Sequence, residues 1–462
     1  MKKGYWIALT LILVLAVGMV VAACGSSTST TTGATTATTA APVSTETTAS
    51  SASTETTAPP ASTDTTAAAN TAPLKFGVAI SLTGVSAAAT PQIKEALDTE
   101  VKYTNANGGI KGRQVQLIYI DDQSNIDTAM AAITSLVDQK CDIIIGPFPD
   151  FVITATRSIT EQAKVLQIPF TSVPLDELVS DQTKWPYYFA PCTGPDGCSD
   201  AFVRALQADG RKNVLGVGDQ MPISAETLQI LNKSLPASDI KFTLMSDSWS
   251  LSETDVTPIA NKIAAKAKDV KPDAIVLCSN PVHVNQMTKI LRSLGVTAPI
   301  YNEASGAHPL VTLAQAGNDP KNVVGDYTIG PPIVDPSQLP DTYPAKADLA
   351  AFLQRWKADN PKEYFASFFV ANGYDTFHLA KLAIETATTQ DEAGYAAALA
   401  KIDYWGAQGH FVFSDSDHVG AHGGMLLWQY TEKGLKLVRD LNTMTDPTLL
   451  PATVDAMATF KK

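Results

Sequence analysis

Short apolar runs alternate with helical stripes along the first part of the chain that has a globular composition. Three of these runs are short enough for buried parallel strands: Phe76–Ile80, Val115–Ile120 and Ile143–Ile145. Between the first two, Gln92–Thr104 carries apolar residues at helical spacing. Asn125 can cap a second helix. The inner stripe of that helix is expected at Met130, Ile133 and Val137. Two consecutive βαβ units with right-handed crossovers predict an open parallel sheet with helices on both faces.

The same alternation resumes after residue 198 and predicts a second βα sheet with its own core. Ser199 can cap the first helix of this block, which Gly210 ends. Four strands are expected there: Val214–Val217, Lys241–Met245, Ala274–Leu277 and Pro299–Tyr301. Three helices follow, at about Ala345–Ala358, Phe368–Ala387 and Asp391–Ile402. A hairpin then joins Met425–Tyr430 to Leu435–Val438. The fold class is therefore α/β.

Before the first sheet, a basic start and a long apolar run indicate a secretory signal peptide over residues 1–23. The small residues before Cys24 resemble the lipobox of bacterial lipoproteins. That resemblance implies cleavage before Cys24 and a lipid on its sulfur. The alternative is an uncleaved transmembrane anchor, because the run nearly reaches the roughly 20 residues that a membrane span needs. Either interpretation places the rest of the chain outside the cytoplasmic membrane.

Residues 24–72 are almost wholly Thr, Ser, Ala and Pro after the cysteine. Such a segment cannot bury enough apolar surface to offset the entropy of ordering it, so it is expected to be a disordered tether. Flexible-chain scaling gives about 48 residues a typical reach near 40 Å. Its Thr and Ser density is compatible with O-glycans, which the sequence does not decide.

The remaining chain is acidic, with a net charge of −12 and no basic run. This balance argues against nucleic acid as a partner and favours solubility. About 390 residues are enough for two lobes with separate cores. After the signal no apolar run is long enough to span a bilayer.

Five cysteines occur. Cys192 and Cys198 flank a turn-rich segment, and in an exported protein this spacing predicts a local disulfide that shapes a loop. Cys141 and Cys278 begin and end expected strands, so they are interpreted as buried free thiols rather than a metal pair.

Motifs of common enzymes are missing, including Gly-x-Ser-x-Gly, the Walker loop and His-Glu-x-x-His. Gly216–Gly218 follows a strand, but Met221 stands where a dinucleotide fingerprint needs its third glycine. Asp121 and Asp122 pair carboxylates at a strand end and are interpreted as turn and capping residues. We expect no catalytic residue and no cofactor.

One cluster has the residue types of a metal site: His410, Asp415, Asp417, His418 and His422. Its structural interpretation is an irregular turn between two strands, and we favour this over a metal site.

Several segments together resemble the leucine/isoleucine/valine-binding branch of the type I periplasmic binding proteins. They occur in that family's order and spacing: Phe76–Gly84, Asn107–Gly112, Tyr119–Asp122, Ile145–Pro147, Gly373–Asp375, Phe413–Gly420 and Leu427–Gln429. The resemblance covers about Leu74 to Asp440. It implies two doubly wound α/β lobes joined by three crossovers, a ligand cleft between them and delivery to an ABC permease.

By analogy with the family, the chain exchanges lobes near Ala190, Tyr327 and Gly409. Lobe 1 then comprises residues 73–190 and 328–409. Lobe 2 comprises residues 191–327 and 410–445, and residues 446–462 form a C-terminal tail.

Parallel sheets bind ligands at the carboxyl ends of their strands, so loops of both lobes are expected to line the cleft. The loops are 82–86, 148–151, 219–223 and 280–283. The candidate ligand-binding residues are Thr83, Phe148, Asp150, Phe151, Asp176, Ile223, Asn280 and Glu303.

The candidate site departs from the amino-acid binders of this family. They place small hydroxyl residues after Gly-Pro and on the next loop, where hydroxyl and backbone N–H groups receive a carboxylate. Here Pro149 removes a donor, and Asp150 and Asp176 offer only acceptors when ionised. A ligand carboxylate about 4 Å from Asp150 would lose about 4 kcal/mol at an effective dielectric of 20. We therefore expect a neutral or cationic ligand, with Phe148 and Phe151 as apolar wall. The alternative is that Asp150 caps the helix starting near Phe151.

These inferences predict an extracytoplasmic, lipid-anchored and monomeric solute-binding protein that closes on a small molecule by hinge motion, without chemistry of its own. Its partners would be the solute and ABC permease subunits. The alternative function is a sensory protein that presents its closed form to a separate receptor.

Overall fold

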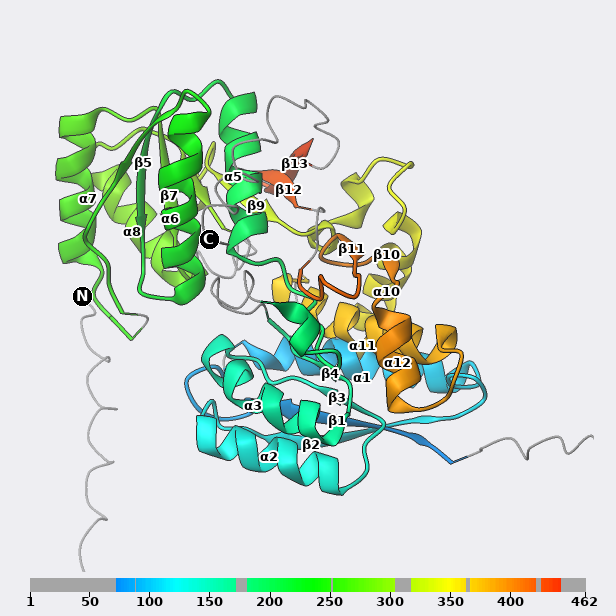
Figure 1. Ribbon diagram of the computed structural model, residues 1–462. Coiled ribbons are helices and arrows are strands. Elements are labelled where there is room, and N and C mark those ends of the chain that lie inside the picture. The colour runs from blue at the N-terminus through cyan, green and yellow to red at the C-terminus, as the bar shows by residue number, and fades with distance from the viewer. Residues whose placement is uncertain are drawn as a thin grey trace, which may run out of the picture. The chain divides into compact units, whose positions relative to one another are not determined.

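The computed structural model describes residues 72–87, 89–171, 181–250, 252–303, 317–362, 366–420 and 425–441 (Figure 1). Several expectations concern residues outside these ranges. They are the signal peptide, the tether up to residue 71, the lipidated Cys24, the candidate Asp176 and the tail 446–462.

A four-stranded parallel sheet with strand order β2-β1-β3-β4 forms the first part of the fold. The strands are β1 (Leu74–Ile80), β2 (Val115–Asp121), β3 (Ile143–Ile145) and β4 (Gln167–Ile168). The connecting helices are α1 (Thr90–Ala106), α2 (Ile126–Asp138) and α3 (Asp150–Ala163). This confirms the two predicted βαβ units and the open parallel sheet.

Both faces of this sheet are covered, because β1 sends alternate side chains to opposite sides. Phe76, Val78 and Ile80 pack into a core with α1, α11 (Phe368–Thr386) and α12 (Glu392–Leu399). Ala79 packs on the other side with α2, as Figure 1 shows for the helices on either side of these strands. The apolar run of β1 is therefore continuous rather than alternating, as expected for a parallel strand buried on both faces.

A second, seven-stranded sheet has the order β13-β12-β9-β8-β7-β5-β6. The first five strands along the chain are parallel: β5 (Asn213–Gly218), β6 (Lys241–Leu244), β7 (Ala274–Cys278), β8 (Ile300–Asn302) and β9 (Tyr327–Gly330). The hairpin of β12 (Leu426–Thr431) and β13 (Gly434–Asp440) adds antiparallel to β9. The predicted hairpin is confirmed.

Four helices accompany the seven-stranded sheet: α5 (Pro195–Ala208), α6 (Pro222–Ala237), α7 (Thr257–Val270) and α8 (Pro281–Ser293). Val214 and Val276 pack with α5 and α6, whereas Leu215 and Leu277 pack with α7 and α8. The sheet is thus doubly wound like the first.

The remaining elements are α10 (Lys346–Asp359), the short strands β10 (Asp403–Trp405) and β11 (His410–Val412), and single helical turns at Gln182–Lys184, Pro320–Asn322, Pro332–Val334 and Pro336–Gln338. α10 packs with Ile333 of the third of these turns and Trp428 of β12 in a further core.

The segments near two expected crossovers are tied by hydrogen bonds. Ala190 donates its N–H to the carbonyl of His418 at 2.9 Å and accepts the N–H of Gly420 at 2.8 Å. The buried Asp375 of α11 accepts the N–H groups of Ala407 at 2.6 Å and Gln408 at 2.7 Å. The boundaries between the two lobes stay a prediction.

Two local predictions are wrong. Met130 is exposed on α2, and the inner face carries Ala129, Ala132, Ile133 and Leu136 instead. The segment expected to form a loop between the two cysteines starts α5 at Pro195, so Ser199 is inside the helix rather than at its cap. Among the described residues, no helix is both long and apolar enough to cross a bilayer.

Candidate functional site

The carboxyl edge of the seven-stranded sheet, where its parallel strands end, brings three polar residues together. Asp219 follows β5, Ser279 follows β7 and Glu303 follows β8, and these strands are neighbours in the sheet. Ser279 donates its hydroxyl to Asp219 Oδ2 at 2.8 Å. Ser224, in the first turn of α6, donates to Glu303 Oε1 at 3.2 Å. The fold thus places two buried carboxyl groups, from distant parts of the chain, at one edge.

Glu303 has an environment that disfavours its charge. Its side chain is almost fully buried, and burial together with the nearby Asp219 raises its pKa to about 8, although the Ser224 hydroxyl acts in the opposite direction. Its Oε2 atom has no hydrogen-bond partner among the described residues. No lysine or arginine of the described ranges pairs with Glu303 or with Asp219. Within the described ranges the two acids therefore accept hydrogen bonds without a positively charged partner.

Thiols adjoin this acidic pair. Cys198 of α5 and Cys278 of β7 are both buried, and burial, with the nearby Glu303, raises the pKa of each thiol well above its ordinary value. Cys192 and Cys198 are present as thiols, so the predicted disulfide is not found in the structure. The physical reason is local: Cys198 is held in the first turns of α5, whereas Cys192 donates its thiol to the carbonyl of Thr193 at 3.5 Å.

The other two candidates on this edge belong to helix starts. Ile223 lies half-buried in the first turn of α6. Asn280 caps α8 by accepting the N–H of His283 at 2.9 Å, and its side-chain amide also lies 2.9 Å from His283 Nδ1. Trp249 donates its indole N–H to the same nitrogen at 3.1 Å. Asn280 therefore has a structural role in the described contacts.

At the carboxyl edge of the four-stranded sheet, three hydroxyl groups already donate to groups of the same sheet edge. Thr83 donates to Asp121 Oδ2 at 2.7 Å, and Ser81 donates to the buried Asp122. Thr171 donates to the carbonyl of Phe148 at 2.6 Å. This confirms that Asp121 and Asp122 act as turn residues, because Asp121 also accepts backbone N–H groups at Leu82, Thr83 and Gln123.

Asp150 is the first residue of α3 and follows Pro149 at the cap position. Its Oδ1 accepts the N–H of Phe151 at 2.9 Å, and burial raises the pKa of its carboxyl group. Asp150 therefore does not cap α3, because Pro149 occupies the cap position and no side chain caps this helix; its acidic group lies in the first helical turn, and a role in ligand binding stays a prediction.

Aromatic side chains border this edge. Phe148 is packed edge-on against Phe369 with 5.7 Å between ring centroids, and Phe151 is 47% exposed. Phe369 packs against the core of the four-stranded sheet, whereas its neighbour Phe368 packs against the core of the seven-stranded sheet. The first turn of α11 therefore contacts both cores with successive residues.

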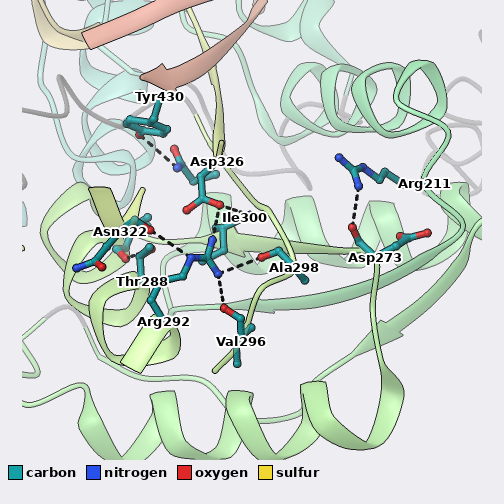
Figure 2. Close-up of polar contacts among 12 residues, drawn as sticks. Arg211, Asp273, Thr288, Arg292, Val296, Ala298, Ile300, Asn322, Asp326 and Tyr430 are labelled. Atoms are coloured by element: carbon teal, nitrogen blue, oxygen red, sulfur yellow. Dashed lines mark hydrogen bonds and ion pairs between the residues drawn. The ribbon is translucent and has the colours of Figure 1, made fainter. Parts of the chain in front are cut away.

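The opposite, amino edge of the seven-stranded sheet has acids with arginine partners (Figure 2). Arg292 donates to Asp326 and to the carbonyls of Asn322, Val296 and Ala298. Asp326 also accepts the N–H of Ile300 at 2.8 Å, which fixes the start of β8. These contacts give the amino edge a structural role.

The cluster considered as a metal site does not assemble in the part of the chain that the structure describes, where no group of three or more metal-ligating side chains occurs. His418 stacks on Phe189 with 4.2 Å between ring centroids, and His410 contacts Asp403 at 2.6 Å. Asp417 forms a turn with Ser414 through two backbone hydrogen bonds. His422 lies outside the described residues. The turn interpretation fits these contacts.

Comparison with known proteins settles the family. Residues 73–434 match the family described as periplasmic binding protein. The chain belongs to the periplasmic binding protein family. This family is one of solute-binding proteins.

Curated relatives support the leucine/isoleucine/valine-binding branch. Over 104 residues the chain is 34% identical to Leu/Ile/Val-binding protein homolog 2 of Brucella abortus (strain 2308). The match covers 22% of this chain and 28% of that relative, so it spans well under a third of either protein.

Solved structures confirm the fold of this periplasmic binding protein. An extracellular ligand-binding receptor from Rhodopseudomonas palustris HaA2 has a TM-score of 0.67 at 20% identity, covering 79% of this chain and 99% of the other. The substrate binding protein LivJ from Streptococcus pneumoniae, in complex with isoleucine, has a TM-score of 0.63 at 21% identity, covering 79% and 99%. A solute binding protein from R. palustris, in complex with benzoate, has a TM-score of 0.64 at 18% identity, covering 80% and 96%.

Sequence reasoning identified Glu303 as a candidate but missed its pairing with Asp219, which it named only as the start of a wall loop. It also missed Ser224 and Ser279. The available signal was a polar residue directly after each of the three apolar strands β5, β7 and β8.

Proposed function

We propose that the chain is the extracytoplasmic solute-binding lipoprotein of an ABC importer, which binds a neutral or cationic small molecule between two lobes and closes by hinge motion. The family supports solute binding and the ABC transporter context. The observation that carries the ligand charge is the buried Asp219–Glu303 pair, which has no counter-charge among the described residues.

The lobe assignment proposed here is the one that the family resemblance implies. Lobe 1, residues 73–190 and 328–409, holds the four-stranded sheet and the helices α10, α11 and α12. Lobe 2, residues 191–327 and 410–445, contributes most of the seven-stranded sheet. Ligand bound between the two carboxyl edges is buried by both lobes, which neither lobe achieves alone.

Solute binding is tested on the chain with Cys24→Ser, which removes the lipid attachment site without touching a described residue. A chemical library is screened by thermal shift, because a ligand that binds only the folded state raises the melting temperature. Small-angle scattering then follows each hit, and we expect a smaller radius of gyration in the bound state. A confirmed ligand that leaves the scattering curve unchanged contradicts hinge closure.

Lipid anchoring is tested separately in a bacterial host. The unaltered chain is expected in the membrane fraction, and the Cys24→Ser chain in the soluble extracytoplasmic fraction. Equal membrane retention of both chains contradicts the lipid anchor and favours the transmembrane alternative.

A further inference from the structure

We propose that the solute is a primary amine that lacks a carboxylate, held through its nitrogen at Asp219 and Glu303 and through an apolar body at the carboxyl edge of the four-stranded sheet. This inference rests on the proposed function, since a solute-binding protein brings both strand edges to one molecule.

The hydrogen-bond acceptors of lobe 2 indicate where the nitrogen of the solute binds. Both oxygens of Asp219 accept hydrogen bonds, from Ser279 and from the N–H of Met221 at 3.0 Å, which holds its carboxylate in place. Glu303 Oε1 accepts from Ser224, while Oε2 is buried and has no partner among the described residues. An ammonium group supplies the missing donor and the missing positive charge together.

The hydrogen-bond donors of lobe 1 indicate that the solute carries no carboxylate. Four side-chain hydroxyls at its strand ends and at the start of α1 already donate to internal acceptors: Ser81 to Asp122, Thr83 to Asp121, Thr90 to the carbonyl of Ser81, and Thr171 to the carbonyl of Phe148. A carboxylate placed there would find these hydroxyls occupied and would face the acidic Asp150. Like charges about 4 Å apart weaken binding by roughly a thousandfold at an effective dielectric of 20.

The apolar body follows from what the same edge exposes. Leu82 is 44% exposed and Val85 86% in the loop after β1, and Phe151 is 47% exposed in the first turn of α3, which follows β3. Phe148 and Phe369 form the edge-on pair beside them. Apolar side chains exposed together at a strand edge are typical of a surface that an apolar ligand covers.

The acidic pair also predicts how binding depends on pH. Glu303 faces Asp219 after β5, Ser224 of α6, and the neutral thiols of Cys198 and Cys278 from α5 and β7. With a pKa of about 8, Glu303 holds a proton at pH 6, and an ammonium ion must displace that proton to bind. Affinity should therefore rise about tenfold per pH unit between pH 6 and 8 and level off above.

The test uses matched probes on the Cys24→Ser chain. A series of primary amines from butylamine to tryptamine is compared with the corresponding carboxylates and α-amino acids, by thermal shift and titration calorimetry. 2-Phenylethylamine, phenylacetate and L-phenylalanine form one such set. We expect amines alone to bind. At pH 6, calorimetry in buffers of different ionisation enthalpy should report release of about one proton per amine bound.

Two variants separate the site from general charge effects. Glu303→Gln keeps an acceptor for Ser224 but cannot ionise, and should weaken amine binding about a hundredfold and abolish proton release. Asp247→Asn removes one acidic group from the same lobe. Asp247 is in the loop after β6 and pairs with Lys262 of α7, so this variant should leave amine binding and proton release unchanged. Circular dichroism confirms that each variant is folded.

Two results would contradict binding of a primary amine. A carboxylate or amino acid that binds as tightly as its matched amine overturns it, and so does a series in which no amine binds. If such a carboxylate also compacts the protein in small-angle scattering, the proposed solute-binding function stands while the amine inference fails. Failure of the whole library to shift the melting temperature counts against the proposed function itself.

Discussion

The two edges of the seven-stranded sheet differ in the partners that they give to acidic side chains. At the amino edge, Asp326 faces Arg292, and Asp209 accepts hydrogen bonds from Arg439 at 3.2 Å and from the hydroxyl of Tyr301. At the carboxyl edge, Asp219 and Glu303 have only hydroxyl and backbone donors among the described residues. Burial opposes ionisation at both edges, and in the part of the chain that the structure describes, positive charge compensates it at the amino edge alone.

The difference appears in the causes behind the two raised pKa values. Burial raises the pKa of Asp326 to about 7, and Arg292 counteracts that rise. For Glu303 burial raises the pKa to about 8, and the neighbouring Asp219 adds to the rise. Each acid has one buried oxygen without a hydrogen-bond partner among the described residues, so charge compensation, rather than the number of hydrogen bonds, distinguishes the edges. The amino edge stabilises the fold, whereas the carboxyl edge keeps an unfavourable arrangement that a ligand can relieve.

The largest expected effect comes from removing the compensating charge at the amino edge. Arg292→Met leaves Asp326 buried without its cation and frees three carbonyls, so we expect a loss of about 3–5 kcal/mol in the free energy of unfolding. Urea unfolding at pH 8 measures it. The loss should be smaller at pH 5, where Asp326 takes up a proton. Adding Asp326→Asn should recover part of the loss, and an unchanged unfolding midpoint for Arg292→Met contradicts the role given to this pair.

At the carboxyl edge, replacing an ionisable side chain by a neutral one should raise the free energy of unfolding rather than lower it. The pKa of Glu303 is raised from 4.5 to about 8 by folding, so the folded state keeps a proton that the unfolded chain loses, and the free energy of unfolding falls progressively as pH rises from about 4.5 to 8. Glu303→Gln lacks this penalty and should be more stable than the unaltered chain by about 3 kcal/mol at pH 7.

The gap between the two proteins should close as pH falls to about 4.5, because Glu303 is then protonated in both the folded and unfolded states. Chemical unfolding of the ligand-free proteins across this pH range measures the gap, with Asp247→Asn as a control that keeps the pH slope of the unaltered chain. Parallel stability curves for the unaltered chain and Glu303→Gln would refute the unpaired-acid interpretation.

The smallest effect concerns the hydroxyl that faces Glu303. Ser224→Ala removes one hydrogen bond of 3.2 Å to a buried acceptor, so we expect a loss of about 1 kcal/mol in unfolding free energy. Because Ser224 lowers the pKa of Glu303, the variant should also shift the pH-dependent part of the stability curve upward in pH. Ser234→Ala, which loses a hydroxyl bonded only within α6, provides the control without a pH shift.

Local patterns in the sequence were sufficient for most of the fold. The apolar runs of β1, β2 and β3 and the cap at Asn125 required only neighbouring residues, and the structure confirms them. The inner face of α2 was misplaced because apolar residues surround that helix, so periodicity alone does not distinguish Met130 from Ala129.

The start of α5 was hidden for a different reason. Gly194–Gly197 has the residues of a turn, yet Pro195 begins the helix because its missing N–H is not needed there, and Ser199 donates back to the carbonyl of Pro195 at 2.6 Å. The Asp219–Glu303 pair could not be inferred from local pattern at all, since only the order of β5, β7 and β8 in the sheet brings the two acids together.

The two successive phenylalanines at the start of α11, Phe368 and Phe369, connect the two cores. Phe368 packs against one core and Phe369 against the other, and a single backbone segment joins them. Successive residues of a helix share one backbone and cannot rotate independently, so a displacement of one core relative to the other would have to be accommodated at this helical turn. A movement of one core when the proposed solute binds would therefore reach the other core through this turn of α11.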